Sequence, residues 1–163
     1  MSAAQPEPVE PDGPGAVPGR RGDQTSTPIG ELDPAQGVEA FRRAEDLLER
    51  RLPLDALKAL APLLEAEAEA ASVHLLAARA YLASAQFRRA EAGFLRVLEL
   101  DPADHYARFA LGRTLQRQSR LAEARAQLRM AAAMDPRPEY QEALGEVSAN
   151  IAVRSDRAGG SGA

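Results

Sequence analysis

Apolar residues recur at helical spacing over most of the chain, from about residue 34 to residue 153. One stripe ends at Leu52-Pro53, because the residue before a proline is pushed out of the helical region, and a second stripe follows the proline. The first and last stripes consist of Val38, Phe41, Ala44, Leu47 and Leu48, and of Tyr140, Leu144, Val147 and Ile151. The pattern predicts an all-α fold of short helices that must pack on one another to be stable.

Two consecutive segments, residues 71–104 and 105–138, superimpose on each other after a shift of 34 residues. Small residues align with small residues, and large apolar residues align with large apolar residues. Both segments close on an Asp-Pro pair, at Asp101-Pro102 and Asp135-Pro136. A fixed period of about 34 residues is typical of stacked helix–turn–helix units. We therefore expect each segment to fold as one helical hairpin.

A first, degraded unit spans residues 37–70. It lacks the closing Asp-Pro pair, and Pro62 lies inside its second helix, where we expect a kink. Asp33 suits the N-cap of the first helix, and a proline directly after it suits the first helical position. The run over residues 139–153 has no partner helix after it, so we expect it to cap the last hairpin. The prediction is one domain over residues 33–153, with three hairpins and a capping helix.

These units resemble the tetratricopeptide repeat family, whose unit of about 34 residues carries small residues at its eighth and twentieth positions and a proline at its thirty-second. The usual Trp near the fourth position is replaced here by Ala40, His74 and Arg108. The resemblance implies a tetratricopeptide-type helical-hairpin solenoid that acts as a protein–protein interaction module or scaffold and not as an enzyme. The matching small residues are Ala44, Ala78 and Gly112 at the eighth position, and Ala56, Ala90 and Ala124 at the twentieth.

In stacked units of this family, the first helix of each hairpin lines a concave face, so the resemblance implies a groove that binds a partner peptide. Arg79, Arg113 and Arg117 are placed to hold an acidic or C-terminal carboxylate, since Arg binds carboxylates through two hydrogen bonds. The alternative is that these arginines pair with Glu45 or Glu49 along the groove. The expected groove residues are Phe41, Glu45, Leu75, Arg79, Leu82, Tyr106, Phe109, Arg113, Gln116 and Arg117.

Composition separates the folded part from two tails. Residues 1–32 are rich in proline and glycine and hold no aromatic residue, and residues 154–163 are similar, so we predict that both tails are disordered. Residues 1–36 carry six acidic and two basic side chains. The remainder is neutral, which argues against a nucleic-acid partner. A single lysine against many arginines, together with abundant alanine, is typical of a small bacterial protein from a GC-rich genome.

The sequence offers little for catalysis or metal binding. His74 and His105 are the only histidines, and the sequence has no Cys to complete a zinc site or form a disulfide. No glycine-rich phosphate loop or catalytic triad is visible, so we expect no catalytic, cofactor-binding or metal-binding residues. No secretory signal and no apolar run of about 18 residues is visible, so we expect no membrane span and place the protein in the cytoplasm.

Two interpretations of the function stay open. The first is a module that binds a protein or peptide partner in its concave groove. The second is a self-associating structural protein, a homo-oligomer whose groove is occluded by its own N-terminal tail. The tail of about 32 residues has a typical end-to-end distance of roughly 30 Å, which is enough to reach the groove.

Overall fold

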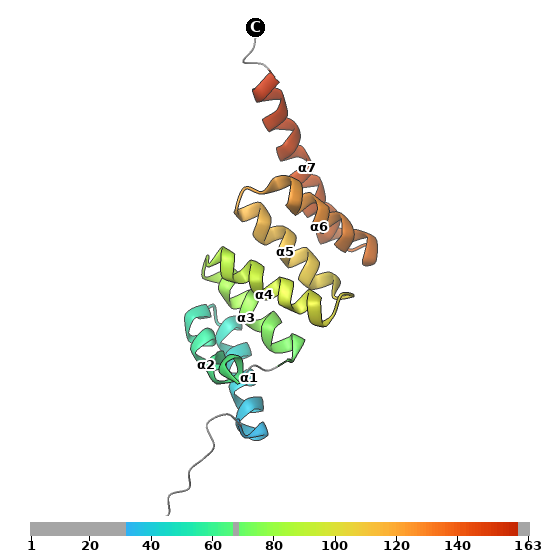
Figure 1. Ribbon diagram of the computed structural model, residues 1–163. Helices are drawn as coiled ribbons and strands as arrows, with labels where there is room; N and C mark the ends of the chain where they lie inside the picture. The colour runs from blue at the N-terminus through green and yellow to red at the C-terminus, as the bar shows by residue number, and fades with distance from the viewer. Residues whose placement is uncertain (1–31, 67–68, 160–163) are drawn as a thin grey trace, which may run out of the picture.

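The computed structural model describes residues 32–66 and 69–159, and this part of the chain contains seven α-helices (Figure 1). Helices α1 and α2, α3 and α4, and α5 and α6 form three hairpins that stack in chain order, and α7 packs on the third. The helices are α1 (Pro34–Glu49), α2 (Pro53–Glu65), α3 (Ala71–Ala83), α4 (Phe87–Leu100), α5 (His105–Arg117), α6 (Leu121–Met134) and α7 (Pro138–Gly159). The architecture is the predicted all-α hairpin solenoid.

The turn inside each hairpin has the same backbone geometry. One residue in each turn adopts the left-handed conformation, with φ values of 61°, 59° and 63° at Arg51, Ala85 and Ser119, which lie 34 residues apart. In the first hairpin the amide of Leu52 donates to the carbonyl of Leu47 at 2.8 Å, and equivalent bonds recur in the other two. This pattern is the Schellman motif, which satisfies carbonyl groups at a helix end. The period therefore extends to the hydrogen bonds of the turns.

Aspartates fix several helix ends. The side chain of Asp33 accepts a hydrogen bond from the amide of Ala35 at 3.1 Å and so caps α1, as expected. Asp104 caps α5 in the same way, accepting from the amide of Ala107 at 2.7 Å. Helices α4 and α6 both end directly before an Asp-Pro pair, as the repeat pattern predicts.

Small residues bring the two helices of each hairpin close together. A Cβ atom added at Gly112 of α5 would lie 2.7 Å from Cγ of Leu128 in α6. A Cβ atom at Gly93 of α4 would lie 2.8 Å from Cβ of Ala78 in α3. Both distances are shorter than carbon atoms tolerate, so these helix pairs depend on glycine. Alanines at the eighth and twentieth positions of the repeats are fully buried as well: Ala44, Ala56, Ala78, Ala90 and Ala124.

An ion-pair network joins the second hairpin to the third. The carboxylate of Glu91 in α4 accepts hydrogen bonds from Arg120 at 2.6 and 2.7 Å and from Gln118 at 2.8 Å. Burial raises the pKa of Glu91, but the hydrogen bonds from Gln118 and Arg120 outweigh it and hold that pKa below its ordinary value. Arg120 also pairs with Glu123, so the network ties the turn of the third hairpin to α4.

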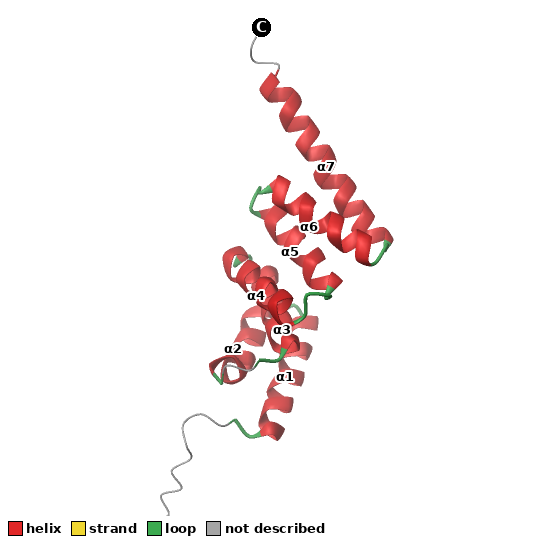
Figure 2. Ribbon diagram, turned by 45° about the vertical axis from the view of Figure 1, so that its right-hand side comes forward, coloured by secondary structure: helices red, strands yellow, loops and turns green. Residues whose placement is uncertain are grey.

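Helix α7 caps the third hairpin and then continues past it (Figure 2). Tyr140 and Val147 in its first half are fully buried, whereas Val153 near its end is 49% exposed. The helix reaches Gly159, so the boundary predicted at residue 153 is wrong. Residues 154–159, predicted as disordered tail, are helical because the helical pattern meets no breaker before the glycine pair at residues 159 and 160.

Three other predictions concern the chain ends, the proline inside α2 and the membrane. The predicted disorder of residues 1–32 and of residues 160–163 falls outside the described residues, apart from Leu32. Pro62 lies inside α2 as expected, and α2 ends at Glu65, one residue earlier in the repeat than α4 and α6 end. Among residues 32–66 and 69–159, no helix is long and apolar enough to span a bilayer.

Candidate functional site

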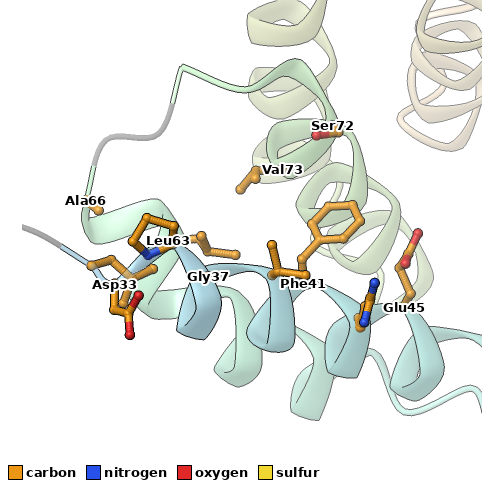
Figure 3. Close-up of a pocket in the computed structure, with 12 residues that line it drawn as sticks. Asp33, Gly37, Phe41, Glu45, Leu63, Ala66, Ser72 and Val73 are labelled. Carbon is orange, nitrogen blue, oxygen red and sulfur yellow. The ribbon is translucent and has the colours of Figure 1, made fainter.

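The N-terminal end of the stack contains an open, mainly apolar pocket of about 690 Å³, called here the N-terminal pocket (Figure 3). Two predicted groove residues of α1, Phe41 and Glu45, line it together with Leu63 of α2 and Val73 of α3. Val38, another lining residue, is 53% exposed. This end of the solenoid therefore leaves apolar side chains accessible to solvent.

A second hollow, called here the central cleft, lies between the second and third hairpins and has a volume of about 450 Å³. Four predicted groove residues meet in it: Leu82 from α3, and Phe109, Arg113 and Arg117 from α5. The cleft thus combines two guanidinium groups with apolar side chains, a composition that suits an acidic ligand with an apolar anchor.

A third hollow, called here the basic pocket, lies between α5 and the second half of α7 and has a volume of about 500 Å³. Arg113 and Arg117 line it from α5, together with Gln116. Arg154 and Arg157 line it from α7. Four arginines therefore face one hollow, two of them from a segment that the sequence reasoning assigned to a disordered tail.

One carboxylate lies among these arginines. Glu146 of α7 accepts a hydrogen bond from Arg113 at 2.7 Å and one from Nε2 of Gln116 at 2.9 Å. The hydrogen bond from Arg113 lowers the pKa of Glu146 below its ordinary value, and it outweighs the opposing effect of burial. The sequence reasoning offered Glu45 or Glu49 as partners of the arginines. For Arg113 the partner is instead Glu146.

Two aromatic side chains of the predicted groove, Phe109 and Tyr106, are partly buried against other side chains. Phe109 stacks on Tyr140 of α7, with ring centroids 4.4 Å apart and an angle of 18° between the planes. Tyr106 lies against Phe109 at 6.4 Å in a tilted arrangement, and both also pack on the main core. The capping helix therefore covers part of the surface that the sequence offered as an aromatic anchor.

The ten predicted residues are spread over more than one hollow. Phe41 and Glu45 line the N-terminal pocket, whereas Leu82, Phe109, Arg113 and Arg117 meet in the central cleft. Between them, Leu75 and Tyr106 pack against the core, and Arg79 is exposed on α3. Gln116 joins the basic pocket.

His105 lies in a cluster of polar side chains with Tyr140 and Asp135. Nδ1 of His105 lies 3.0 Å from the hydroxyl of Tyr140, and Nε2 lies 3.4 Å from a carboxylate oxygen of Asp135. The three side chains join the start of α5 to the start of α7. In the described part of the chain, no group of three or more His, Cys, Asp or Glu side chains is placed to hold a metal ion.

Comparison with known proteins supports the repeat assignment. Residues 94–126, which run from α4 through α5 into α6, match the sequence model of the tetratricopeptide repeat. The fold is a tetratricopeptide-repeat solenoid. No curated protein matches the chain in a sequence search. The fold assignment therefore rests on the repeat match together with the solved structures.

Several solved structures share this solenoid. The first tetratricopeptide domain of Spaghetti (RPAP3), bound to the HSP90 peptide SRMEEVD, has a TM-score of 0.69 at 17% identity, with 76% of this chain and 98% of that one covered. The first such domain of human RPAP3 gives a TM-score of 0.70 at 16% identity, with the same coverage. The type III secretion translocator chaperone SycD of Yersinia enterocolitica gives a TM-score of 0.63 at 19% identity, covering 78% of this chain and 88% of that one.

Sequence reasoning missed the α7 side of the tetratricopeptide solenoid. Glu146, Asn150, Val153, Arg154 and Arg157 all line the basic pocket. Their spacing of three and four residues places them on one face of a helix. That spacing was visible in the sequence, but it lay across the boundary drawn at residue 153.

Proposed function

We propose that this protein is a cytoplasmic interaction module that binds a segment of a partner protein along the concave side of its solenoid. The observation that carries the proposal is the central cleft, where Arg113 and Arg117 lie beside Leu82 and Phe109. Arginines next to partly buried apolar side chains are the composition that recurs at protein–peptide contacts. A modest interface of this kind suits micromolar affinity.

The solved structures support this choice of function. Spaghetti, which has the same fold, is described with the bound HSP90 peptide SRMEEVD, in which three of the last four residues are acidic. A related second domain of human RPAP3 is described with the HSP70 peptide SGPTIEEVD. We do not assign either peptide to this chain, because the identities are below 20%. What we carry over is the class of ligand, a segment of another protein.

The test is capture of partners from a lysate of the source cells, followed by affinity measurement with the purified partner. Arg113→Glu/Arg117→Glu reverses the two charges of the cleft. Arg88→Glu/Arg129→Glu makes the same charge change at exposed positions of α4 and α6 and is the matched control. We expect partners to be lost only by the cleft variant. If both variants capture the same partners and have the same thermal stability, the proposal is contradicted.

The alternative function is self-association, with the groove occluded by the protein's own N-terminal segment. It is favoured by exposed apolar side chains at both ends of the stack, Val38 at one and Val153 at the other. Sedimentation over a hundredfold concentration range tests it. A mass that stays monomeric, together with unchanged partner affinity after deletion of residues 1–31, would remove this alternative.

A further inference from the structure

The basic pocket carries a strong local excess of positive charge in a chain whose net charge is −4. Its lining includes four arginines and a single acid, Glu146. Arg113 forms an ion pair with that acid. Within the described residues, Arg117, Arg154 and Arg157 form no ion pair shorter than 4.0 Å. Three guanidinium groups therefore face one hollow without a carboxylate of their own.

The carboxylate of Glu146 is already bound by polar side chains of α5. Its two oxygens are bound separately, one by Arg113 and the other by Gln116, and both of these side chains come from the predicted groove surface. The side chain of Glu146 is nevertheless 53% exposed, and that of Arg113 is 34% exposed. An exposed ion pair of this kind is weak, so replacement of Glu146 costs little, and further contacts of an incoming segment can offset the freedom that the segment loses.

The pair between Arg113 and Glu146 is not what holds α7 in place. That helix is anchored by the buried side chains of Tyr140, Ala143 and Val147. Stacking of Phe109 on Tyr140 adds to this anchor. Burial of such side chains is worth several times more than an exposed ion pair. Glu146 is therefore free to change partner without release of the helix.

We propose that the basic pocket binds an acidic peptide segment, and that Glu146 is an internal carboxylate which the segment displaces from Arg113 and Gln116. This inference rests on the proposed function and names the chemistry of the partner. Displaced Glu146 moves into solvent, while the segment's remaining carboxylates pair with Arg117, Arg154 and Arg157. Glu146 then sets the affinity, because every ligand must replace it.

The experiment measures fluorescence anisotropy of the full chain with two labelled decapeptides, one carrying four glutamates and the other carrying glutamine at the same four positions. We expect binding of the glutamate peptide only. Glu146→Gln should tighten that binding roughly threefold to tenfold, because it removes the internal carboxylate that the segment must displace from Arg113. Glu142→Gln makes the same charge change one turn earlier on α7, at an exposed position, and should leave the affinity unchanged.

A second pair of variants separates this inference from the proposed function. Arg154→Gln/Arg157→Gln removes the two positive charges that α7 contributes to the pocket. We expect it to weaken binding of the glutamate peptide roughly tenfold at low salt. If these changes and Glu146→Gln have no effect while Arg113→Glu/Arg117→Glu abolishes binding, the displacement inference fails and the proposed function stands. If both peptides bind equally, or neither binds, an acidic ligand for the basic pocket is excluded.

Discussion

The two ends of the solenoid differ in how they meet solvent. At the N-terminal end, α1 faces solvent, and an apolar pocket of about 690 Å³ stays open beside Phe41. At the C-terminal end, α7 covers the apolar edge of the third hairpin, and what remains open is a hollow lined by arginines. The repeat itself therefore does not decide the chemistry of its exposed ends. The flanking helix decides it.

Truncation of the Tyr140 side chain, which lies under the capping helix, should give the largest effect on stability. Tyr140 is fully buried, stacks on Phe109 and contacts His105 through its hydroxyl. Tyr140→Ala should lower the free energy of unfolding by about 3–5 kcal/mol, since it leaves a cavity under the cap. Chemical denaturation monitored by circular dichroism measures this change.

The open end provides the matched control for this prediction. Phe41→Ala removes a large ring that is only partly buried, so its cost should be clearly smaller than that of Tyr140→Ala. Tyr140→Phe removes the hydroxyl alone and should cost about 1 kcal/mol. Equal losses for Phe41→Ala and Tyr140→Ala would mean that the two ends are equally closed.

Overpacking of the third hairpin should give an intermediate effect. A Cβ at Gly112 meets Leu128 at 2.7 Å, whereas a Cβ at Gly145 of α7 meets nothing within 4 Å. Gly112→Val should therefore destabilise the protein by about 1–3 kcal/mol. Gly145→Ala should stabilise it by about 0.5–1 kcal/mol, because alanine is the better helix former. Thermal unfolding that ranked the two variants in the opposite order would contradict the close approach of α5 and α6.

The third prediction concerns the ion pairs between hairpins, whose loss should cost less than the cavity at Tyr140 or the overpacking at Gly112. The second and third hairpins are joined through the ion pair of Glu91 with Arg120. The residue 34 positions before Glu91 is Leu57, which cannot form the equivalent ion pair between the first and second hairpins. Glu91→Gln should cost about 1 kcal/mol at neutral pH. The pKa of Glu91 is lowered in the folded state, so its contribution is present above its ordinary pKa and is lost as the pH falls through the folded value.

The pH dependence supplies the check. Unfolding titrations of the wild type and Glu91→Gln between pH 7 and pH 3 should converge at the acid end, because protonation of Glu91 removes the same interaction. A constant difference across this range would show that the carboxylate charge is not the stabilising feature.

The repeat architecture could be predicted from the sequence because close packing of the helices requires particular residue types at particular positions. Alanine and glycine at the eighth position and Asp-Pro at the unit ends correspond to buried contacts and helix ends in the structure. The turns were harder to predict. Arg51, Ala85 and Ser119 adopt a left-handed backbone that is usually assigned to glycine or asparagine, so their residue types gave no signal.

The candidate site was predictable only in part. Arg113, Arg117 and Phe109 follow from their position on the first helix of a hairpin, and the structure brings them together. The partner of Arg113, Glu146, lies 33 residues away on a helix whose packing angle is a tertiary property. Helical periodicity identifies the buried face of such a helix but does not identify which neighbour its polar face meets.

The unequal anchoring of α7 has a mechanical consequence. The buried part of α7 runs from Tyr140 to Val147, and Arg157 stands about 15 Å beyond Val147, at a rise of 1.5 Å per residue. A tilt of roughly 5° of the buried part moves the arginine by about 1 Å, which is enough to lengthen a hydrogen bond beyond its usual range. The width of the arginine-lined hollow therefore depends on the angle at which the buried half of α7 packs on the third hairpin.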